Sequence, residues 1–237
     1  FKKASEMEFD AKIQEDAYLN YAKLSYEIGN PYQSVPEIMN AYLAKYPNTS
    51  YKQEINTLLI SSYITSKNYK EALVLLEKSK SPENKLAYQK VTFYRGLELY
   101  TDGDFKGAYS LFKKSIAENK DAKFSARATF WKGETEYNLD QFEEAKLSFL
   151  QFLNSSEAST TPEFKNANYN LAYAYFKLKE YDNAIKYFGD FTTSIKDDKV
   201  RLTDAYLRLG DCNFISTKYW PAMDAYNKAI DLKSVDA

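Results

Sequence analysis

The chain has 237 residues, and its 32 Lys and Arg residues against 33 Asp and Glu residues give a formal charge of −1, so it lacks the positive field that attracts nucleic acid. It has no His and one Cys, which excludes the usual general base near neutral pH, His-activated nucleophiles and a Cys/His zinc site. No apolar run approaches the roughly 18 residues that span a bilayer. We therefore expect no catalytic residue, metal, cofactor, nucleic acid partner or membrane-spanning segment.

A short motif recurs in chain order and predicts the architecture. An aromatic residue precedes an alanine by three residues at regularly spaced places, as in Phe105 and Ala108, Phe142 and Ala145, Tyr181 and Ala184, and Tyr219 and Ala222. Counted from Ala72 onward, these alanines are 36 to 39 residues apart. Around each motif, apolar residues at spacings of three and four indicate two helices joined by a short polar turn. A period of this length predicts a solenoid of antiparallel helix pairs.

The period divides the chain into about six units, which we place at residues 15–48, 53–84, 89–122, 126–160, 165–198 and 203–236. Phe1 and Ala4 stand 37 residues before Ile38 and Ala41, so the chain is expected to begin within the second helix of a preceding unit. The Ser/Thr-rich residues 154–163 are expected to form a long loop between units. We expect one domain over residues 1–237, a fragment of a longer array whose last helix has no polar cap.

Small residues occupy the same place in successive first helices: Gly96, Gly133, Ala172 and Gly210. Glycine inside a helix costs about 1 kcal/mol relative to alanine, so its use here indicates close helix contact. We expect the repeated alanine of the second helix to face this small residue. An aromatic residue four places later would then fill the next layer, and these residues are Phe112, Phe149, Phe188 and Tyr226.

Small residues at two facing positions and aromatic residues beside the turn resemble the tetratricopeptide repeat. The resemblance implies an all-α, right-handed superhelical solenoid. The first unit ends in YLAKYPNTS, residues 42–50, which looks like the FxxxYPxS ending of the YbgF/BamD-like subgroup of bacterial envelope proteins. That likeness implies a location in the periplasm or cell envelope.

The family resemblance also implies where a partner would bind. First helices line the concave face of such a superhelix, and the residues that point into it recur at the second, fifth, ninth and twelfth places of a unit. Carried over to this sequence, the register predicts partner-binding residues Phe93, Leu97, Tyr100, Phe130, Tyr137, Tyr169, Tyr173 and Phe176. Exposed, these rings would mark an interaction site; buried, they would be internal packing, and both interpretations stay open. The Lys and Asn residues with which chaperone-binding members hold a C-terminal carboxylate are not reproduced.

Trp131, Trp220 and Cys212 are interpreted as packing residues. Trp131 falls in a first helix, and Trp220 directly follows the aromatic residue of a turn. Cys212 lies inside a predicted helix, where a free thiol usually behaves as a small apolar group.

These observations predict a non-catalytic scaffold that binds a peptide or protein in an aromatic groove and acts in bacterial envelope assembly. The alternative is a sensing or positioning segment of a larger enzyme or signalling protein, because tetratricopeptide arrays also occur beside catalytic modules. Residues 1–17 and 222–237 would expose apolar faces at the two ends of the solenoid, which predicts end-to-end self-association.

Overall fold

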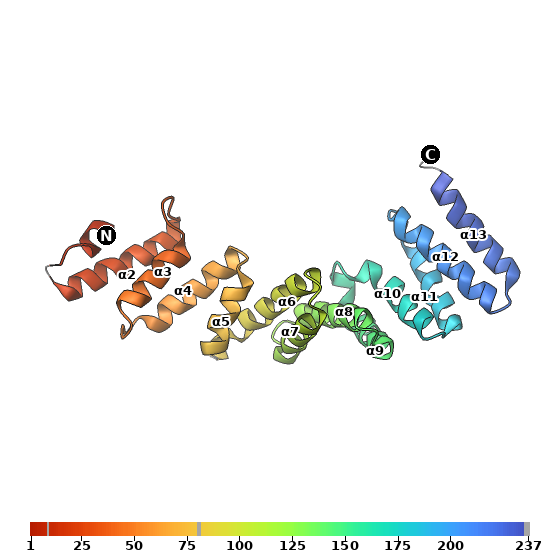
Figure 1. Ribbon diagram of the computed structural model, residues 1–237, viewed down its shortest axis with the longest axis horizontal. Helices are drawn as coiled ribbons and strands as arrows, with labels where there is room; N and C mark the ends of the chain where they lie inside the picture. The colour runs from red at the N-terminus through yellow and green to blue at the C-terminus, as the bar shows by residue number, and fades with distance from the viewer. Residues whose placement is uncertain (9, 80–81, 235–237) are drawn as a thin grey trace. The chain divides into compact units, whose positions relative to one another are not determined.

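Helices make up nearly all of the regular structure in this computed structural model, which describes residues 1–8, 10–79 and 82–234 (Figure 1). A short helix, α1 (Lys2–Ser5), precedes six antiparallel helix pairs. The pairs are α2 (Ala11–Ile28) and α3 (Val35–Lys45), α4 (Lys52–Thr65) and α5 (Tyr69–Ser79), α6 (Lys85–Thr101) and α7 (Phe105–Glu118), α8 (Ala122–Asn138) and α9 (Phe142–Leu153), α10 (Phe164–Lys177) and α11 (Tyr181–Ser194), and α12 (Lys199–Ile215) and α13 (Tyr219–Ser234). Two 3₁₀ helices, η1 (Pro82–Asn84) and η2 (Ala158–Thr160), lie between pairs. The predicted all-α fold of stacked helix pairs is confirmed.

The helix pairs fall into two compact units, Phe1–Val91 and Thr92–Ala237, and each is described by itself. Every first helix begins one to four residues before the start predicted from the period. The period locates the repeat but not the helix cap: α8, for example, begins where the Asp121 side chain accepts hydrogen bonds from the backbone N–H groups of Lys123 and Phe124. The prediction of a single domain stays a prediction. Residues 235–237, within the predicted sixth unit and C-terminal face, lie outside the described residues.

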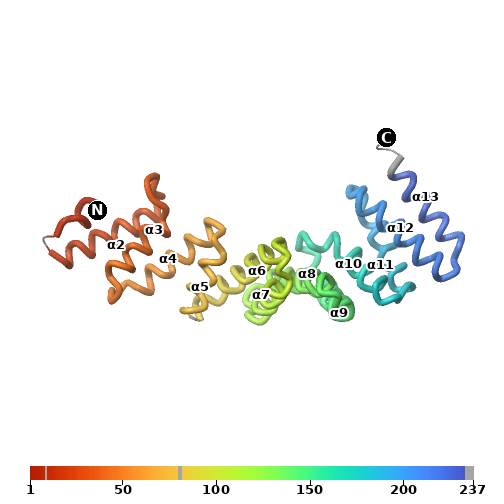
Figure 2. Tube along the Cα trace, viewed as in Figure 1, coloured from red at the N-terminus to blue at the C-terminus, as the bar shows by residue number. Residues whose placement is uncertain are grey.

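Five of the six pairs share one turn geometry, visible as sharp reversals of the chain in Figure 2. In each turn one residue has a left-handed backbone, with φ near 60° in four turns and 81° at a glycine; the residues are Lys67, Gly103, Asp140, Lys179 and Thr217. The next residue donates its N–H to the carbonyl five positions earlier, as Gln141 does to Glu136 at 2.9 Å. This is the Schellman ending of a helix. Glycine suits the conformation best, yet only one turn uses it, so the backbone geometry repeats without a repeated residue.

Aromatic rings cover the small residues of the first helices. A Cβ atom at Gly133 would lie 2.9 Å from the Phe149 ring, and one at Gly96 would lie 2.8 Å from the Phe112 ring. The predicted close helix contact is therefore present, but the ring meets the glycine where we expected the alanine of the second helix. The reason is geometric. The alanine and the aromatic residue four places later share one face of the second helix, and the larger aromatic side chain extends far enough to contact the glycine.

Each compact unit has its own apolar core. In the first unit the core contains Ile38, Met39, Tyr42, Ile55 and Leu59. In the second unit the core includes Phe130, Phe149, Phe152, Phe188 and Phe191.

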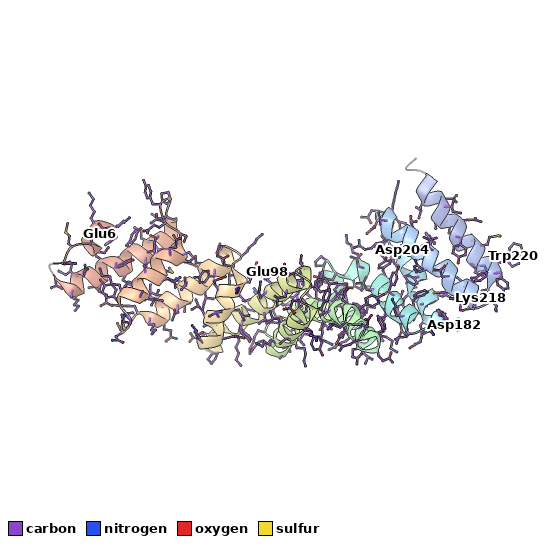
Figure 3. All side chains as sticks on the ribbon, in the orientation of Figure 1. Glu6, Glu98, Asp182, Asp204, Lys218 and Trp220 are labelled. Carbon is purple, nitrogen blue, oxygen red and sulfur yellow. The ribbon has the colours of Figure 1, made fainter. Side chains whose placement is uncertain are left out.

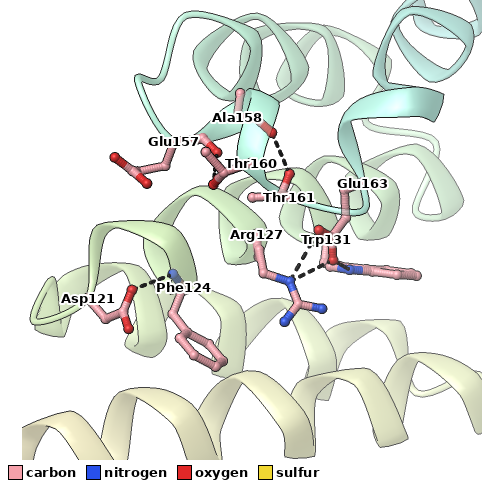
Figure 4. A network of polar contacts seen from close by, with 9 residues as sticks. All are labelled: Asp121, Phe124, Arg127, Trp131, Glu157, Ala158, Thr160, Thr161 and Glu163. Atoms are coloured by element: carbon pink, nitrogen blue, oxygen red, sulfur yellow. Dashed lines mark hydrogen bonds and ion pairs between the residues drawn. The ribbon is translucent and has the colours of Figure 1, made fainter.

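The long loop before α10 is fastened to α8 by a buried carboxylate (Figure 4). Glu163 is 6 % exposed and accepts hydrogen bonds from Arg127 Nε at 2.9 Å and Trp131 Nε1 at 3.0 Å. The Arg127 guanidinium lies 4.6 Å from the centre of the Phe93 ring, a cation–π contact. Ala158 in the same loop is also buried. The predicted long loop is thus a packed segment that joins two helix pairs.

Trp220 corrects the interpretation of both tryptophans as packing residues. Trp131 packs partly buried against the core, whereas Trp220 is 79 % exposed and points away from the helices at the start of α13 (Figure 3). It stands one residue past the turn aromatic, on a face of α13 that no described helix covers.

Glu163→Gln is expected to lower the free energy of unfolding by about 3 kcal/mol, because it leaves the Arg127 guanidinium half-buried without its counter-charge. Urea unfolding followed by circular dichroism measures the change. Glu144→Gln, at an exposed position of α9, removes the same charge and serves as the control. Equal unfolding midpoints for the two variants would contradict this account of the loop.

Candidate functional site

The eight predicted partner-binding residues all lie on the first helices α6, α8 and α10, but they differ in burial. Phe93 and Phe130 are 0 % and 4 % exposed and belong to the core. The other six are partly buried; they are Leu97, Tyr100, Tyr137, Tyr169, Tyr173 and Phe176. Two of the eight side chains are therefore internal packing, and six retain some access to solvent.

Three of the six line a hollow of about 240 Å³ on the second compact unit. These are Tyr137 on α8 and Tyr169 and Tyr173 on α10. The remaining walls come from Glu134, Asn138, Phe149 and Asn170. The structure thus brings aromatic rings, two side-chain amides and one carboxyl group together, whereas Leu97, Tyr100 and Phe176 do not line this hollow.

Hydrogen bonds to Asp204 on α12 fix the two tyrosines of α10 (Figure 3 marks Asp204). Tyr169 donates to Asp204 Oδ2 at 2.8 Å, and Tyr173 donates to the same oxygen. Their rings meet edge to face, with centroids 5.0 Å apart. Burial and the bond to Asp204 raise the pKa of Tyr173 to about 12 and that of Tyr169 further, so both hydroxyls stay protonated and keep donating.

Arg208 extends this network along α12. Its Nε lies 3.7 Å from Asp204 Oδ1, and its Nη1 donates to Asp211 Oδ2 at 2.6 Å. Tyr226 of α13 donates to Asp211 at 2.9 Å. The guanidinium charge is therefore shared by two carboxylates, and the rings of α10 are tied through α12 to α13.

Glu134 is the carboxyl group of the hollow, and its pKa is displaced towards neutral pH. Burial raises the pKa of its carboxyl from 4.5 to about 7, although a hydrogen bond from Tyr100 and the positive charge of Arg201 pull it down. Tyr100 donates to Glu134 Oε2 at 3.2 Å, and Asn138 Nδ2 donates to the Tyr100 hydroxyl at 3.0 Å. Among the described residues no Lys or Arg forms an ion pair with Glu134.

The predicted set of binding residues left out the acidic residues of this site, although the register contains them. Glu134 stands at the ninth place of its unit, in the same register as the predicted rings. Extending that register to the unit at 203–236 selects Asp204 at the second place and Asp211 at the ninth. Restricting the set to aromatic and apolar residues discarded Glu134, and stopping at the fifth unit left out the other two.

A second polar cluster has the residue types of a Ser–Lys nucleophile but not its accessibility. Lys132 Nζ lies 2.7 Å from Glu136 and 2.6 Å from Ser148 Oγ. The Ser148 hydroxyl donates its hydrogen bond to Glu136 Oε2 and not to the lysine. Ser148 is 2 % exposed, which leaves no approach for a substrate. The cluster is a buried polar network between α8 and α9.

The remaining chemistry-bearing groups give no second site. Cys212 is fully buried, and burial raises the pKa of its thiol to about 12, so it packs as predicted. Within residues 1–8, 10–79 and 82–234, no three His, Cys, Asp or Glu side chains are grouped so that they could hold a metal ion. No described helix combines the length and the apolar character that crossing a membrane requires.

Glu134→Gln is expected to flatten the pH dependence of stability between pH 4.5 and 7. In that interval the unfolded chain has lost the proton that the folded chain still holds on Glu134, so rising pH favours unfolding, by up to about 3 kcal/mol for a pKa displaced this far. Thermal unfolding of wild type, Glu134→Gln and the exposed-site control Glu144→Gln at pH 4.5, 6 and 8 measures it. The difference in unfolding temperature between Glu134→Gln and the other two proteins should widen with pH. Parallel pH profiles for all three proteins would refute the raised pKa of Glu134.

Comparison with known proteins supports the fold reached from the sequence. Residues 166–195, within α10 and α11, match the family model of the tetratricopeptide repeat. No curated protein sequence matches the chain significantly. Among solved structures, YrrB, titled a TPR protein with an unusual peptide-binding site, is 15 % identical with a TM-score of 0.59, covering 84 % of this chain and 94 % of YrrB. BtubC from P. vanneervenii is 13 % identical with a TM-score of 0.59, covering 93 % and 89 %.

A third solved structure, MamA from Desulfovibrio magneticus RS-1, is 17 % identical with a TM-score of 0.56 and covers 77 % of this chain and 95 % of its own. At these identities the likeness concerns the fold. The chain therefore resembles tetratricopeptide solenoids in fold, and one of its helix pairs also matches the repeat family by sequence.

Proposed function

We propose that this chain is a non-catalytic scaffold that binds a peptide or protein segment on the aromatic surface of its first helices. The observation that carries the proposal is the hollow of about 240 Å³ lined by Tyr137, Tyr169 and Tyr173. Tyrosine is enriched at binding surfaces because its ring supplies apolar contact area while its hydroxyl tolerates water. The hollow can therefore receive a side chain of a partner that lies along α8 and α10.

The rigidity of the rings supports the same function. Asp204 fixes Tyr169 and Tyr173 in place before any partner arrives, so binding would order few side chains and lose little conformational entropy. A core of large rings, including Phe149 and Phe188, lies beneath them. YrrB, which has this fold, is described as binding a peptide, and we extend that mode of action to this chain.

The double variant Tyr137→Ala, Tyr169→Ala is expected to lose its partner without unfolding, because both rings are only partly buried and form the wall of the hollow. A pull-down from native cell extract with wild type and variant side by side, followed by mass spectrometry, measures the loss. Tyr109→Ala, a partly buried tyrosine on α7 outside the hollow, is the matched control. Equal recovery of every protein by all three baits would argue that the tyrosines serve internal packing.

We also propose that the chain self-associates through α13. Its outward face carries large apolar side chains that remain exposed: Trp220 at 79 %, Met223 at 49 % and Ile230 at 61 %. Adjacent exposed apolar residues of this kind are usually covered by a partner.

The variant Met223→Lys, Ile230→Lys is expected to reduce self-association, because charges on this face would have to be desolvated on contact. Light scattering of wild type and variant over a hundredfold range of concentration measures the mass. A wild type that stays monomeric at the highest concentration would contradict the proposal.

A bacterial envelope or periplasmic role remains a proposal supported by residues 42–50 alone. In the structure Tyr42 of this segment is buried and Tyr46 packs against the same core, so the YP ending has a structural use whatever the location. Fractionation of native cells, with antibody detection of the protein in periplasm, membrane and cytoplasm, tests the location directly.

A further inference from the structure

The lining of the hollow contains a carboxyl group and no cationic side chain. None of its seven lining residues is a Lys or Arg, and Glu134 is its carboxyl group. The Asn170 side-chain amide forms no hydrogen bond with any other described residue, so its carbonyl oxygen remains available as an acceptor. The polar groups that face the hollow are thus suited to receive a donor.

The surroundings of the hollow are acidic as well. Glu134, Asp140 and Asp204 all act on the Tyr137 phenol, against the single positive charge of Arg208. Arg208 is already paired with Asp204 and Asp211. Arg201, which reaches Glu134 at longer range, is paired with Asp198 at 2.6 Å. Both nearby guanidinium groups are therefore already paired elsewhere, while Glu134 has no ion-pair partner among the described residues.

The aromatic rings of the hollow supply, beside the Glu134 carboxyl group, a second kind of contact for a cation. Tyr137 and Tyr173 meet nearly at right angles, at 80° with centroids 6.4 Å apart, so the faces and edges of different rings line the same space. Aromatic faces attract Arg and Lys side chains through the ring quadrupole. Pockets for whole small molecules have volumes of about 300–1,000 Å³; at about 240 Å³ this hollow is suited to one long side chain.

We propose that the hollow binds an Arg or Lys side chain of the partner peptide, with its cationic group beside the Glu134 carboxylate and its stem against Tyr137 and Tyr173. This inference rests on the proposed peptide-binding function and specifies its partner as a segment with at least one basic residue. Binding converts Glu134 fully to its ionised form, because the bound cation supplies the counter-charge that the free folded chain does not provide for this carboxylate.

The test is a titration of the ¹⁵N-labelled full chain with two capped pentapeptides, one with a central arginine and one with citrulline, which has nearly the same shape without the charge. The arginine peptide is expected to shift the amide signals of Asn138 and Asn170, and the citrulline peptide to bind at least about tenfold more weakly. Glu134→Gln should weaken arginine binding by a similar factor. Glu144→Gln, with the same loss of charge on exposed α9, should leave it unchanged.

The outcomes separate this inference from the function on which it rests. Equal binding of the two peptides, shifts outside the hollow, or unchanged arginine binding by Glu134→Gln would overturn the basic-residue assignment. The pull-down with Tyr137→Ala, Tyr169→Ala would still decide whether the surface binds a protein. If that pull-down recovers no partner while arginine still shifts the hollow, the cation site stands and the scaffold function falls.

Discussion

The second unit depends on one repeated contact, in which an aromatic ring of the second helix of a pair packs against a small residue of the first helix. Phe149 lies so close to Gly133 that a single added carbon would stand 2.9 Å from its ring, and Phe112 bears on Gly96 in the same way. The helix-propensity cost of each glycine, about 1 kcal/mol, is offset by the apolar area that a fully buried phenylalanine removes from water, worth about 1.5–3 kcal/mol. This packing sets the distance between paired helices, and the distance determines where the tyrosines of the next face lie.

Polar contacts then fix the orientation of side chains that apolar packing alone does not determine. Apolar surfaces attract without direction, so they cannot by themselves orient a ring at the edge of the core. Asp204 does so for two tyrosines of α10, and Glu163 does so for Trp131 and Arg127 of α8. Each carboxylate comes from the following helix pair or its connecting loop. Neighbouring pairs are therefore joined by directional bonds as well as by burial, which is the nearest-neighbour coupling that stabilises solenoids.

The sequence predicted the fold better than the site, for a physical reason. The regular spacing of the alanines reflects helix packing that is repeated in successive pairs. The helix pairs and the close contact at Gly96 and Gly133 could therefore be predicted from it. The site depends on residues that occur once: Asp204 has no acidic counterpart at Lys90, Arg127 or Asn166, the second places of three earlier units. A period shows which places of a unit face the site, but not which residue type occupies each of them. Trp220 is a separate case: its counterparts Lys106, Glu143 and Asp182 are all exposed, and its interpretation as a packing residue rested on its size and not on its place in the repeat.

Glu134 shows that a binding site can be recognised by a residue that lowers the stability of the fold. Its carboxyl group forms no ion pair with any described residue, and its displaced pKa means that ionisation near neutral pH opposes folding. A residue that served packing alone would be replaced without loss by Gln, which can keep the hydrogen bond from Tyr100. Its charge becomes useful only when a positive group enters the hollow, where low polarity strengthens the attraction. The carboxyl group that weakens the free chain is thus the feature that gives the aromatic hollow a preference among otherwise similar side chains.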